Sequence, residues 1–199
     1  MEFAVTPVQV IQISVNMLVF ASFLEDAIRQ GGITPKVFKE ELRIGREEDS
    51  VSFKVAWTPE LLRDSSRNNT LMALGNTAIG TQKAVEVLYG PTNPMDTSPI
   101  GSARVILYQI RCAFAHDPLN PKWTPHVEKY NRTYEVFLYV KGSSGSVGRK
   151  ISLHPPSLDT KRLSPEDFGG IAAYLDLLRY FLSKAEAHPK GHQPYSPYE

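Results

Sequence analysis

Residues 99–118 read PIGSARVILYQIRCAFAHDP, and this stretch predicts a hydrophobic helix with an abrupt end. Apolar side chains recur along it at helical spacing: Val105, Ile106, Ile110, Ala113 and Phe114. Pro118 disfavours helical geometry at Asp117, so the helix is expected to end at or near His116. We expect it to begin at about Pro99, because proline is favoured in the first turn of a helix.

Arg111 and His116 lie at the end of this predicted helix. Histidine transfers protons near neutral pH, and the planar guanidinium of arginine matches a phosphate. Metal-independent cleavage of RNA needs both chemistries. Five positions on a straight helix separate the two side chains by about 140°. They therefore share one site only if the helix ends or distorts at His116, or if two copies of the chain form a two-fold cleft that collects both pairs.

Three further substantial helices are predicted, at residues 7–29, 69–88 and 164–187. Thr6-Pro7 and Ser164-Pro165 are typical helix starts. A short helix is expected from Lys36 to Leu42, and another short helical turn at residues 58–60. The first long helix has so wide an apolar face that we expect burial on more than one side, in the core or across a dimer.

The N-terminal run from Phe3 to Leu24 carries no charged residue. A helix that spans a membrane needs about 20 predominantly apolar residues. Polar side chains interrupt this run: Gln9, Gln12, Ser14, Asn16 and Ser22. We therefore expect a buried helix of a soluble protein and no membrane partner, with a membrane anchor as the alternative.

Strand patterns occur in two places. Residues 51–57 alternate, and residues 134–140 and 150–154 flank a Gly/Ser loop at 142–148, which predicts a hairpin. The strand at 51–57 is a candidate third strand for that hairpin. The expected fold class is mainly α, a four-helix bundle with an inserted β-hairpin or small three-stranded sheet. The expected organisation is one domain at residues 1–187, with the β insertion at about 130–155 and a flexible tail at 188–199.

Composition sets broad limits on function. The formal net charge of +1 over 199 residues gives no global indication of nucleic-acid binding. The charge is uneven, however, because residues 101–150 carry eight Lys/Arg against three Asp/Glu. That block suits a polyanionic ligand, and it is also common on solvated surfaces. Cys112 is the single cysteine and the N-terminus lacks a basic secretory segment, so we expect a reducing, cytoplasmic location.

The segment Ile110–His116 resembles the signature of the HEPN superfamily, an arginine followed after four to six residues by a histidine. The resemblance implies a helical homodimer whose cleft holds the two motifs. It also implies a metal-independent endoribonuclease without cofactor, acting as a toxin, a defence effector or an RNA-processing factor. On this interpretation His116 is the acid/base and Arg111 clamps the scissile phosphate.

Two alternatives remain open at this stage. The first is a non-catalytic module of the same fold that binds RNA, a nucleotide or a protein partner such as an antitoxin. It is favoured by Cys112, because active HEPN members commonly have a polar residue directly after the arginine. The second is a structural helical protein in which the pair is accidental and Arg111 pairs with an acid such as Asp117.

The remaining candidate residues have weaker patterns. Lys141, Arg149 and Lys150 flank the hairpin loop and are candidates for contact with RNA phosphates. Cys112 and His116 are four apart, which permits a thiolate–imidazole pair, although a small buried cysteine fits better. His126 and His154 stand alone and are interpreted as surface or strand-end residues.

Overall fold

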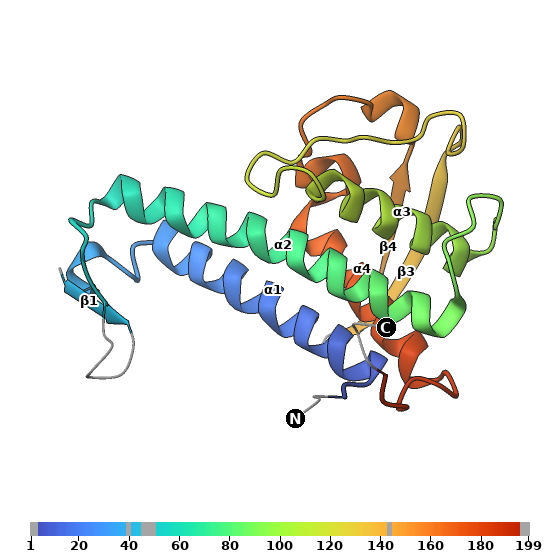
Figure 1. Ribbon diagram of the computed structural model, residues 1–199, viewed down its shortest axis with the longest axis horizontal. Helices are drawn as coiled ribbons and strands as arrows, with labels where there is room; N and C mark the ends of the chain where they lie inside the picture. The colour runs from blue at the N-terminus through green and yellow to red at the C-terminus, as the bar shows by residue number, and fades with distance from the viewer. Residues whose placement is uncertain (1–3, 39–40, 45–50, 143–144, 196–199) are drawn as a thin grey trace.

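The computed structural model describes residues 4–38, 41–44, 51–142 and 145–195, with the backbone alone at 41–44, 51–53, 140–142 and 145–147 (Figure 1). These residues form four α-helices: α1 (Pro7–Arg29), α2 (Pro59–Tyr89), α3 (Pro99–Phe114) and α4 (Gly170–Glu186). They also form two separate antiparallel strand pairs, β1–β2 and β3–β4. The predicted mainly helical fold with a β-hairpin is confirmed.

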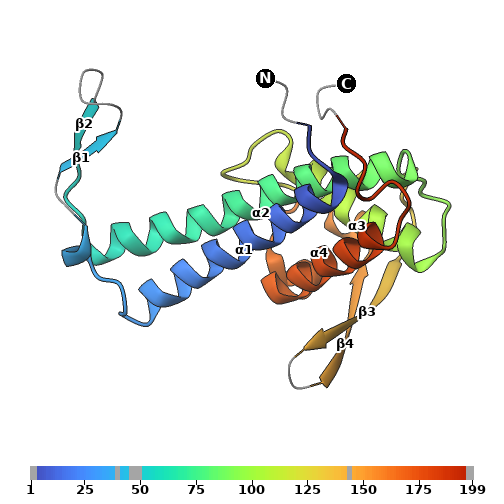
Figure 2. The same ribbon diagram turned by 90° about the horizontal axis from the view of Figure 1, so that it is seen from below.

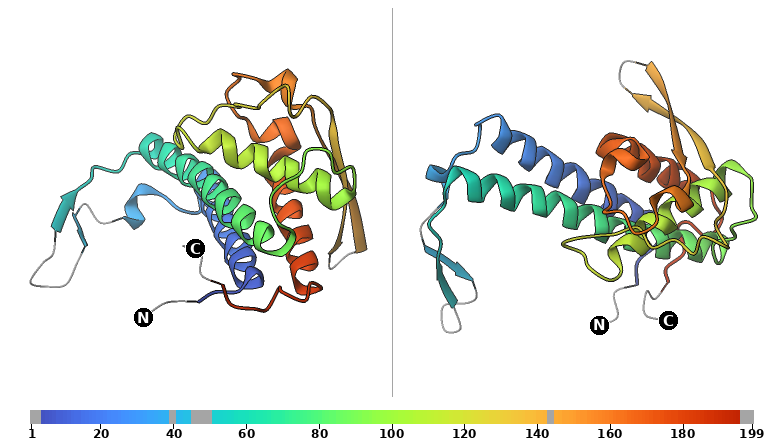
Figure 3. Two further views of the ribbon diagram at one scale, coloured as in Figure 1. Left: turned by 45° about the vertical axis from the view of Figure 1, so that its right-hand side comes forward. Right: turned by 90° about the horizontal axis from the view of Figure 1, so that it is seen from above.

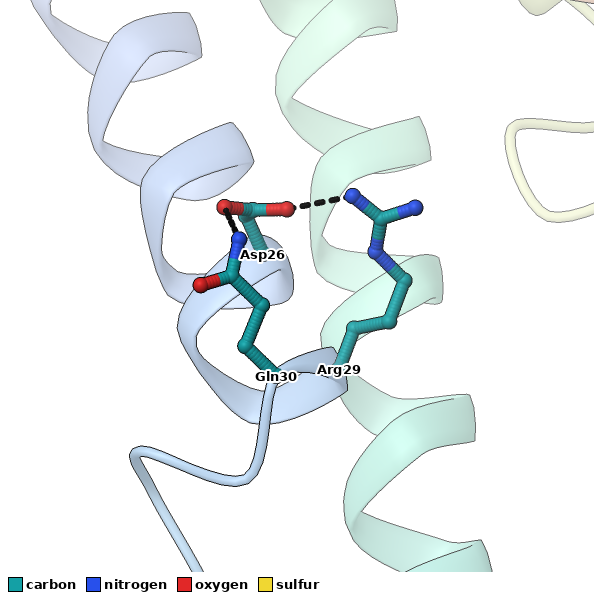
Figure 4. A network of polar contacts seen from close by, with 3 residues as sticks. All are labelled: Asp26, Arg29 and Gln30. Carbon is teal, nitrogen blue, oxygen red and sulfur yellow. Dashed lines mark hydrogen bonds and ion pairs between the residues drawn. The ribbon is translucent and has the colours of Figure 1, made fainter.

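α1 begins and ends at the residues that the sequence predicts. The Thr6 hydroxyl accepts a hydrogen bond from the Gln9 N–H (3.2 Å), and the Gln9 side chain accepts one from the Thr6 N–H (2.9 Å). This capping box satisfies two backbone donors at the helix start. At the other end, the Asp26 carboxylate contacts both the Arg29 guanidinium and the Gln30 amide (Figure 4). Local signals at both termini therefore define this helix.

α2 is one continuous helix, whereas the sequence predicted a short turn at 58–60 and a helix from Asn69. The Thr58 hydroxyl caps it by accepting from the Leu61 N–H (3.1 Å). From its start to Thr70 it buries only a narrow stripe at every fourth position: Leu62, Ser66 and Thr70. So narrow a buried stripe in a polar stretch gives a weak amphipathic signal, which explains why the sequence predicted a helix only from Asn69.

β1 (Glu41–Ile44) and β2 (Val51–Lys54) pair at the far end of the α1–α2 arm (Figure 2). Two predictions are wrong here. Residues 35–37 form a single 3-10 turn and 41–44 form a strand, in place of a helix from Lys36 to Leu42. The strand predicted at 51–57 ends at Lys54 and pairs with β1, so it is not a third strand of the other hairpin. A nearby partner in sequence costs less loop-closure entropy than a distant one.

The second half of the chain forms a body beside the α1–α2 pair (Figure 3). α3 packs on α2 and on β3 (Tyr134–Gly142), and α4 packs on α1 and against the strand pair. β3 pairs with β4 (Gly145–Leu153), and their inward side chains are buried: Tyr134, Val136, Leu138, Ile151 and Leu153. The helix predicted from Ser164 is split, because Gly169 adopts φ +96° between a 3-10 turn at Pro165–Phe168 and α4.

The two ends of the described chain lie together beside the start of α1. The Tyr195 N–H donates to the Val5 carbonyl (2.9 Å), and the Val8 N–H donates to the Gly191 carbonyl (3.1 Å). The segment predicted as a flexible tail thus contacts the N-terminal segment as far as residue 195, and residues 196–199 lie outside the description. The mobility of this segment stays a prediction.

α1 leaves one side uncovered within the described chain. Five large apolar side chains on it are 42–67% exposed, and we call them the α1 apolar face: Ile13, Met17, Val19, Phe20 and Phe23. By length and composition, α1 is also apolar enough to cross a membrane. A third of its most apolar stretch of 18 residues is buried. The prediction of burial on more than one side is therefore wrong for the single chain, because α2 and α4 cover only the opposite side.

Candidate pocket at the end of α3

A pocket of about 290 Å³ lies at the C-terminal end of α3. It is formed by the last turns of the helix and by the loop that follows. Its lining residues are Tyr108, Gln109, Arg111, Cys112, Ala115, His116, Thr124 and His126. The structure therefore brings the two residues of the predicted motif, Arg111 and His116, to one pocket within a single chain.

The end of α3 explains how Arg111 and His116 reach the same pocket. The last helical residue is Phe114, and the Ala115 N–H donates to the Cys112 carbonyl three residues back (3.1 Å). This tightened turn places His116 beyond the regular helix, where the separation of an ideal helix no longer applies. The sequence prediction required such an ending at His116.

Arg111 has no carboxylate partner in the part of the chain that the structure describes. Asp117, its predicted structural partner, instead accepts hydrogen bonds from the Leu119 N–H (3.2 Å) and the Asn120 N–H (3.1 Å). The eight lining residues include one arginine and two histidines but no aspartate or glutamate. This composition suits an anionic ligand such as a phosphodiester.

A close approach between two helices fixes the end of α3. Phe114 is buried and lies against Gly75 of α2. A Cβ atom added at Gly75 would lie 2.6 Å from the Phe114 ring, which is inside van der Waals contact. Gly75 therefore permits the packing that positions the residues around Phe114, including Arg111 and His116.

His126 is exposed, as the sequence predicted, but it also lines the pocket, which the sequence did not indicate. It comes from the loop after α3, which is anchored by Trp123, a side chain 1% exposed. The Trp123 indole N–H donates to Asp167 Oδ2 (2.7 Å), and its backbone N–H donates to the Lys161 carbonyl (2.9 Å). These long-range contacts bring the loop back toward α3 and carry Thr124 and His126 to the pocket.

A pair of stacked tyrosines fixes the other side of this loop. The His126 carbonyl accepts from the Lys129 and Tyr130 N–H groups, which closes a turn directly after the histidine. The buried Tyr130 ring stacks on Tyr108 of α3, with ring centroids 5.7 Å apart. Burial raises the pKa of both phenols, and the Cys112 side chain adds to the effect on Tyr108. Both tyrosines therefore stay protonated at neutral pH, and their stacked rings pack the loop against α3.

Gln109 contributes an unpaired polar group to the pocket wall. Its side chain is 2% exposed, and its Nε2 atom has no hydrogen-bond partner among the described residues. An unsatisfied buried amide costs about 1–3 kcal/mol. The Nε2 atom is itself buried, so this cost falls on the stability of the α3 end.

The candidate residues on the hairpin do not line this pocket. Arg149 pairs with Asp176 of α4 (Nε to Oδ2, 2.9 Å), and Lys150 pairs with Glu135 of β3 (Nζ to Oε1, 2.7 Å). The side chain of Lys141 lies outside the described part of the structure. A role for these three cations in substrate binding stays a prediction.

Other hollows offer different chemistry. A second pocket of about 410 Å³ lies between α2 and residues 162–166, and its charged lining has both signs: Glu25, Arg67, Arg162 and Glu166. It contains no histidine or cysteine, so it lacks a group that exchanges protons at neutral pH. Among the described residues, no group of three or more His, Cys, Asp or Glu side chains is placed to hold a metal ion.

Fold and site together define the class of protein: a mainly helical chain with a β-hairpin and an arginine–histidine pocket at the end of its third helix. Comparison of the chain with family models, curated proteins and solved structures finds no match.

Proposed function

We propose that the chain is a metal-independent endoribonuclease that cuts RNA in the pocket at the end of α3. The observation that carries this proposal is that Arg111 and His116 line one small pocket without a carboxylate. A permanent cation and a proton-transfer group at one point are what transesterification at a phosphodiester requires. The resemblance of Ile110–His116 to the HEPN signature supports the same activity.

The reaction begins at the ribose next to the scissile phosphate. The 2′-oxygen attacks phosphorus while His116 exchanges its proton, so the O2′–P bond forms and the P–O5′ bond breaks. Arg111 stabilises the negative charge that increases on the non-bridging oxygens. The products are a 2′,3′-cyclic phosphate on one fragment and a 5′-hydroxyl on the other. A toxin, defence or RNA-processing role in the cytoplasm fits such an activity.

In this proposal the protein forms a homodimer through the α1 apolar face. At 100° per residue, its five side chains fall within about 160° of the helix circumference. They leave roughly 500 Å² of apolar surface uncovered, a large part of the roughly 800 Å² that each partner buries in a stable interface. The segment from Phe3 to Leu24 is uncharged, so two copies meet there without repulsion.

A dimer of this kind keeps its two pockets apart. α2 packs on both α1 and α3 and lies between them (Figure 1), so the helix that carries the α1 apolar face and the helix that carries the pocket lie on different sides of α2. Each pocket then acts with the residues of its own chain. This arrangement differs from the shared cleft that the HEPN resemblance implies.

The test is RNA cleavage in EDTA by the wild type, Arg111→Ala and His116→Ala. We expect each substitution to lower the rate at least 100-fold, which is the usual range for a proton-transfer or phosphate-binding group. Matched controls are Arg63→Ala, on the distal part of α2, and His154→Ala, at the end of β4. Cleavage that persists in His116→Ala would exclude the proposed mechanism.

A second candidate is a non-catalytic module that binds RNA, a nucleotide or an antitoxin-like protein. It is favoured by Cys112, which lines the pocket where active HEPN members place a polar residue. RNA binding by the folded wild type without any cyclic-phosphate product would support this candidate over the nuclease.

A further inference from the structure

We propose that His126 is the general acid of the pocket, so that one chain holds both proton-transfer groups for RNA cleavage. This inference rests on the proposed ribonuclease function and deepens it. Its basis is the juxtaposition of His116, His126 and Arg111 around one cavity.

The cavity that both histidines line is large enough for one phosphodiester. A volume of 290 Å³ corresponds to a sphere about 8 Å across, near the lower limit of small-molecule pockets. An acid and a base act within about 2.6–3.2 Å of the oxygens that they serve. The proposed complex has the scissile phosphate between His116 and His126, with the ribose 2′-oxygen toward His116 and the 5′-oxygen toward His126.

The backbone around His126 is held on both sides. Trp123 anchors the preceding residues to Lys161 and Asp167. On the other side, a local turn closes on the His126 carbonyl, and Tyr130 stacks on Tyr108, which itself lines the pocket. The backbone thus brings His126 to the edge of the pocket, while its side chain is exposed and accessible to substrate.

The charged groups around the two histidines have both signs, but they do not neutralise the positive charge in the lining of the pocket. From α3 these are Arg111, Cys112 and Tyr108, and Asp117 directly follows His116. Glu128 and Lys129 share with His126 the neighbouring shallow hollow. The carboxylates thus lie outside the lining of the pocket, and Arg111 remains free to hold the phosphate.

The proposed step balances in protons and bonds. Neutral His116 takes the 2′-hydroxyl proton while the O2′–P bond forms. The P–O5′ bond breaks, its electron pair moves to O5′, and O5′ takes a proton from the His126 imidazolium. Solvent then returns both histidines to their starting states.

Leaving-group chemistry separates the acid from the base. The two substrates are a short RNA and uridine 3′-(4-nitrophenyl phosphate), whose nitrophenolate leaves without protonation. We expect His126→Ala to lose at least 100-fold on RNA and to stay within a few-fold of the wild type on the nitrophenyl ester. His116→Ala should lose activity on both substrates, and His154→Ala should change neither.

Each other outcome has a defined meaning. His126→Asn, with its melting curve, checks that a loss does not come from unfolding, and it should match His126→Ala. Wild-type rates for His126→Ala on RNA would overturn the inference and leave the ribonuclease proposal standing. Equal losses on the two substrates would also overturn it, because an acid is not needed for the ester. A wild type that cleaves neither substrate would overturn the ribonuclease itself.

Discussion

α1 exposes five large apolar side chains between Ile13 and Phe23, whereas α3 buries every residue from Gly101 to Leu107. Both helices are predominantly apolar in sequence, and they differ in how many neighbours cover them. α1 is covered by α2 and α4 on one side, while α3 lies between α2 and β3. An apolar sequence therefore predicts a helix whose apolar side chains must be buried. Only the tertiary structure shows whether other elements of the same chain bury them.

The same difference separates two kinds of function. On α3 the polar residues past Ile110 stand out against a buried helix and converge on a pocket. On α1 the exposed residues include the large side chains of the α1 apolar face beside the polar Gln9, Gln12 and Asn16, and the apolar ones fit association with a second copy. The predictions below test this division between a pocket on α3 and an interface on α1.

The largest expected effect on stability comes from the anchor of the pocket loop. Trp123→Ala removes a buried indole and its hydrogen bond to Asp167, so we expect a loss of about 3–5 kcal/mol in the free energy of unfolding. Urea denaturation measures it. Trp57 is only partly buried, and Trp57→Ala is the matched control, with a smaller loss. Equal effects at both positions would contradict the role of Trp123 as an anchor.

Next in size is the effect of a charge on the α1 apolar face. Phe20→Glu places a carboxylate in the proposed interface, where burying an unpaired charge is unfavourable. We expect dimerisation to weaken at least 100-fold while RNA cleavage persists. Sedimentation velocity over a concentration series measures the dissociation constant. Ser183→Glu, on an exposed part of α4, is the control and should leave the dissociation constant unchanged. A monomeric wild type would contradict the proposed dimer.

A smaller effect is expected at the contact between α2 and the end of α3. Gly75→Ala introduces a Cβ atom against Phe114, and overpacking of this kind costs about 1–3 kcal/mol. Gly80→Ala on the same helix meets only ordinary contacts at 3.6–3.7 Å, so it should stabilise the protein by about 0.5–1 kcal/mol. Thermal melting of the two variants should give shifts of opposite sign. Shifts of the same sign would show that helix propensity, not the Phe114 contact, governs position 75.

The smallest expected effect concerns the unpaired amide in the pocket wall. Gln109→Leu replaces a buried Nε2 that lacks a partner in the described structure, so we expect a gain of about 1 kcal/mol in stability. Because this Nε2 atom is itself buried, KM for RNA should stay unchanged. A destabilised variant would show that the Gln109 amide makes a stabilising contact.

The sequence predicted those parts of the fold that local signals control. The capping residues Thr6 and Gln9 fix the start of α1, and the predicted bounds agree with the structure. A strand at 51–57 was predicted, but β1 and its pairing with β2 were missed because pairing between 41–44 and 51–54 is a property of two segments together. Local periodicity in either segment does not show which partner it takes.

The candidate site was predictable to the same limited extent. Arg111 and His116 lie close in sequence, and the break at Asp117-Pro118 indicated how they meet. His126 is ten residues further on, and its place in the pocket depends on the long-range Trp123–Asp167 contact. The signal for it was the pair of large aromatic residues, Trp123 and Tyr130, that flank it in a Pro-rich loop.

The central claim is that one chain holds a complete RNA-cleaving pocket. Its most direct test is a mixed dimer in which one subunit carries Arg111→Ala and the other His116→Ala. We predict that co-refolding the two inactive variants restores no cyclic-phosphate formation, because each pocket lacks one of its own residues. Recovery of activity on mixing would contradict the account and show that Arg111 and His116 act together across a shared cleft.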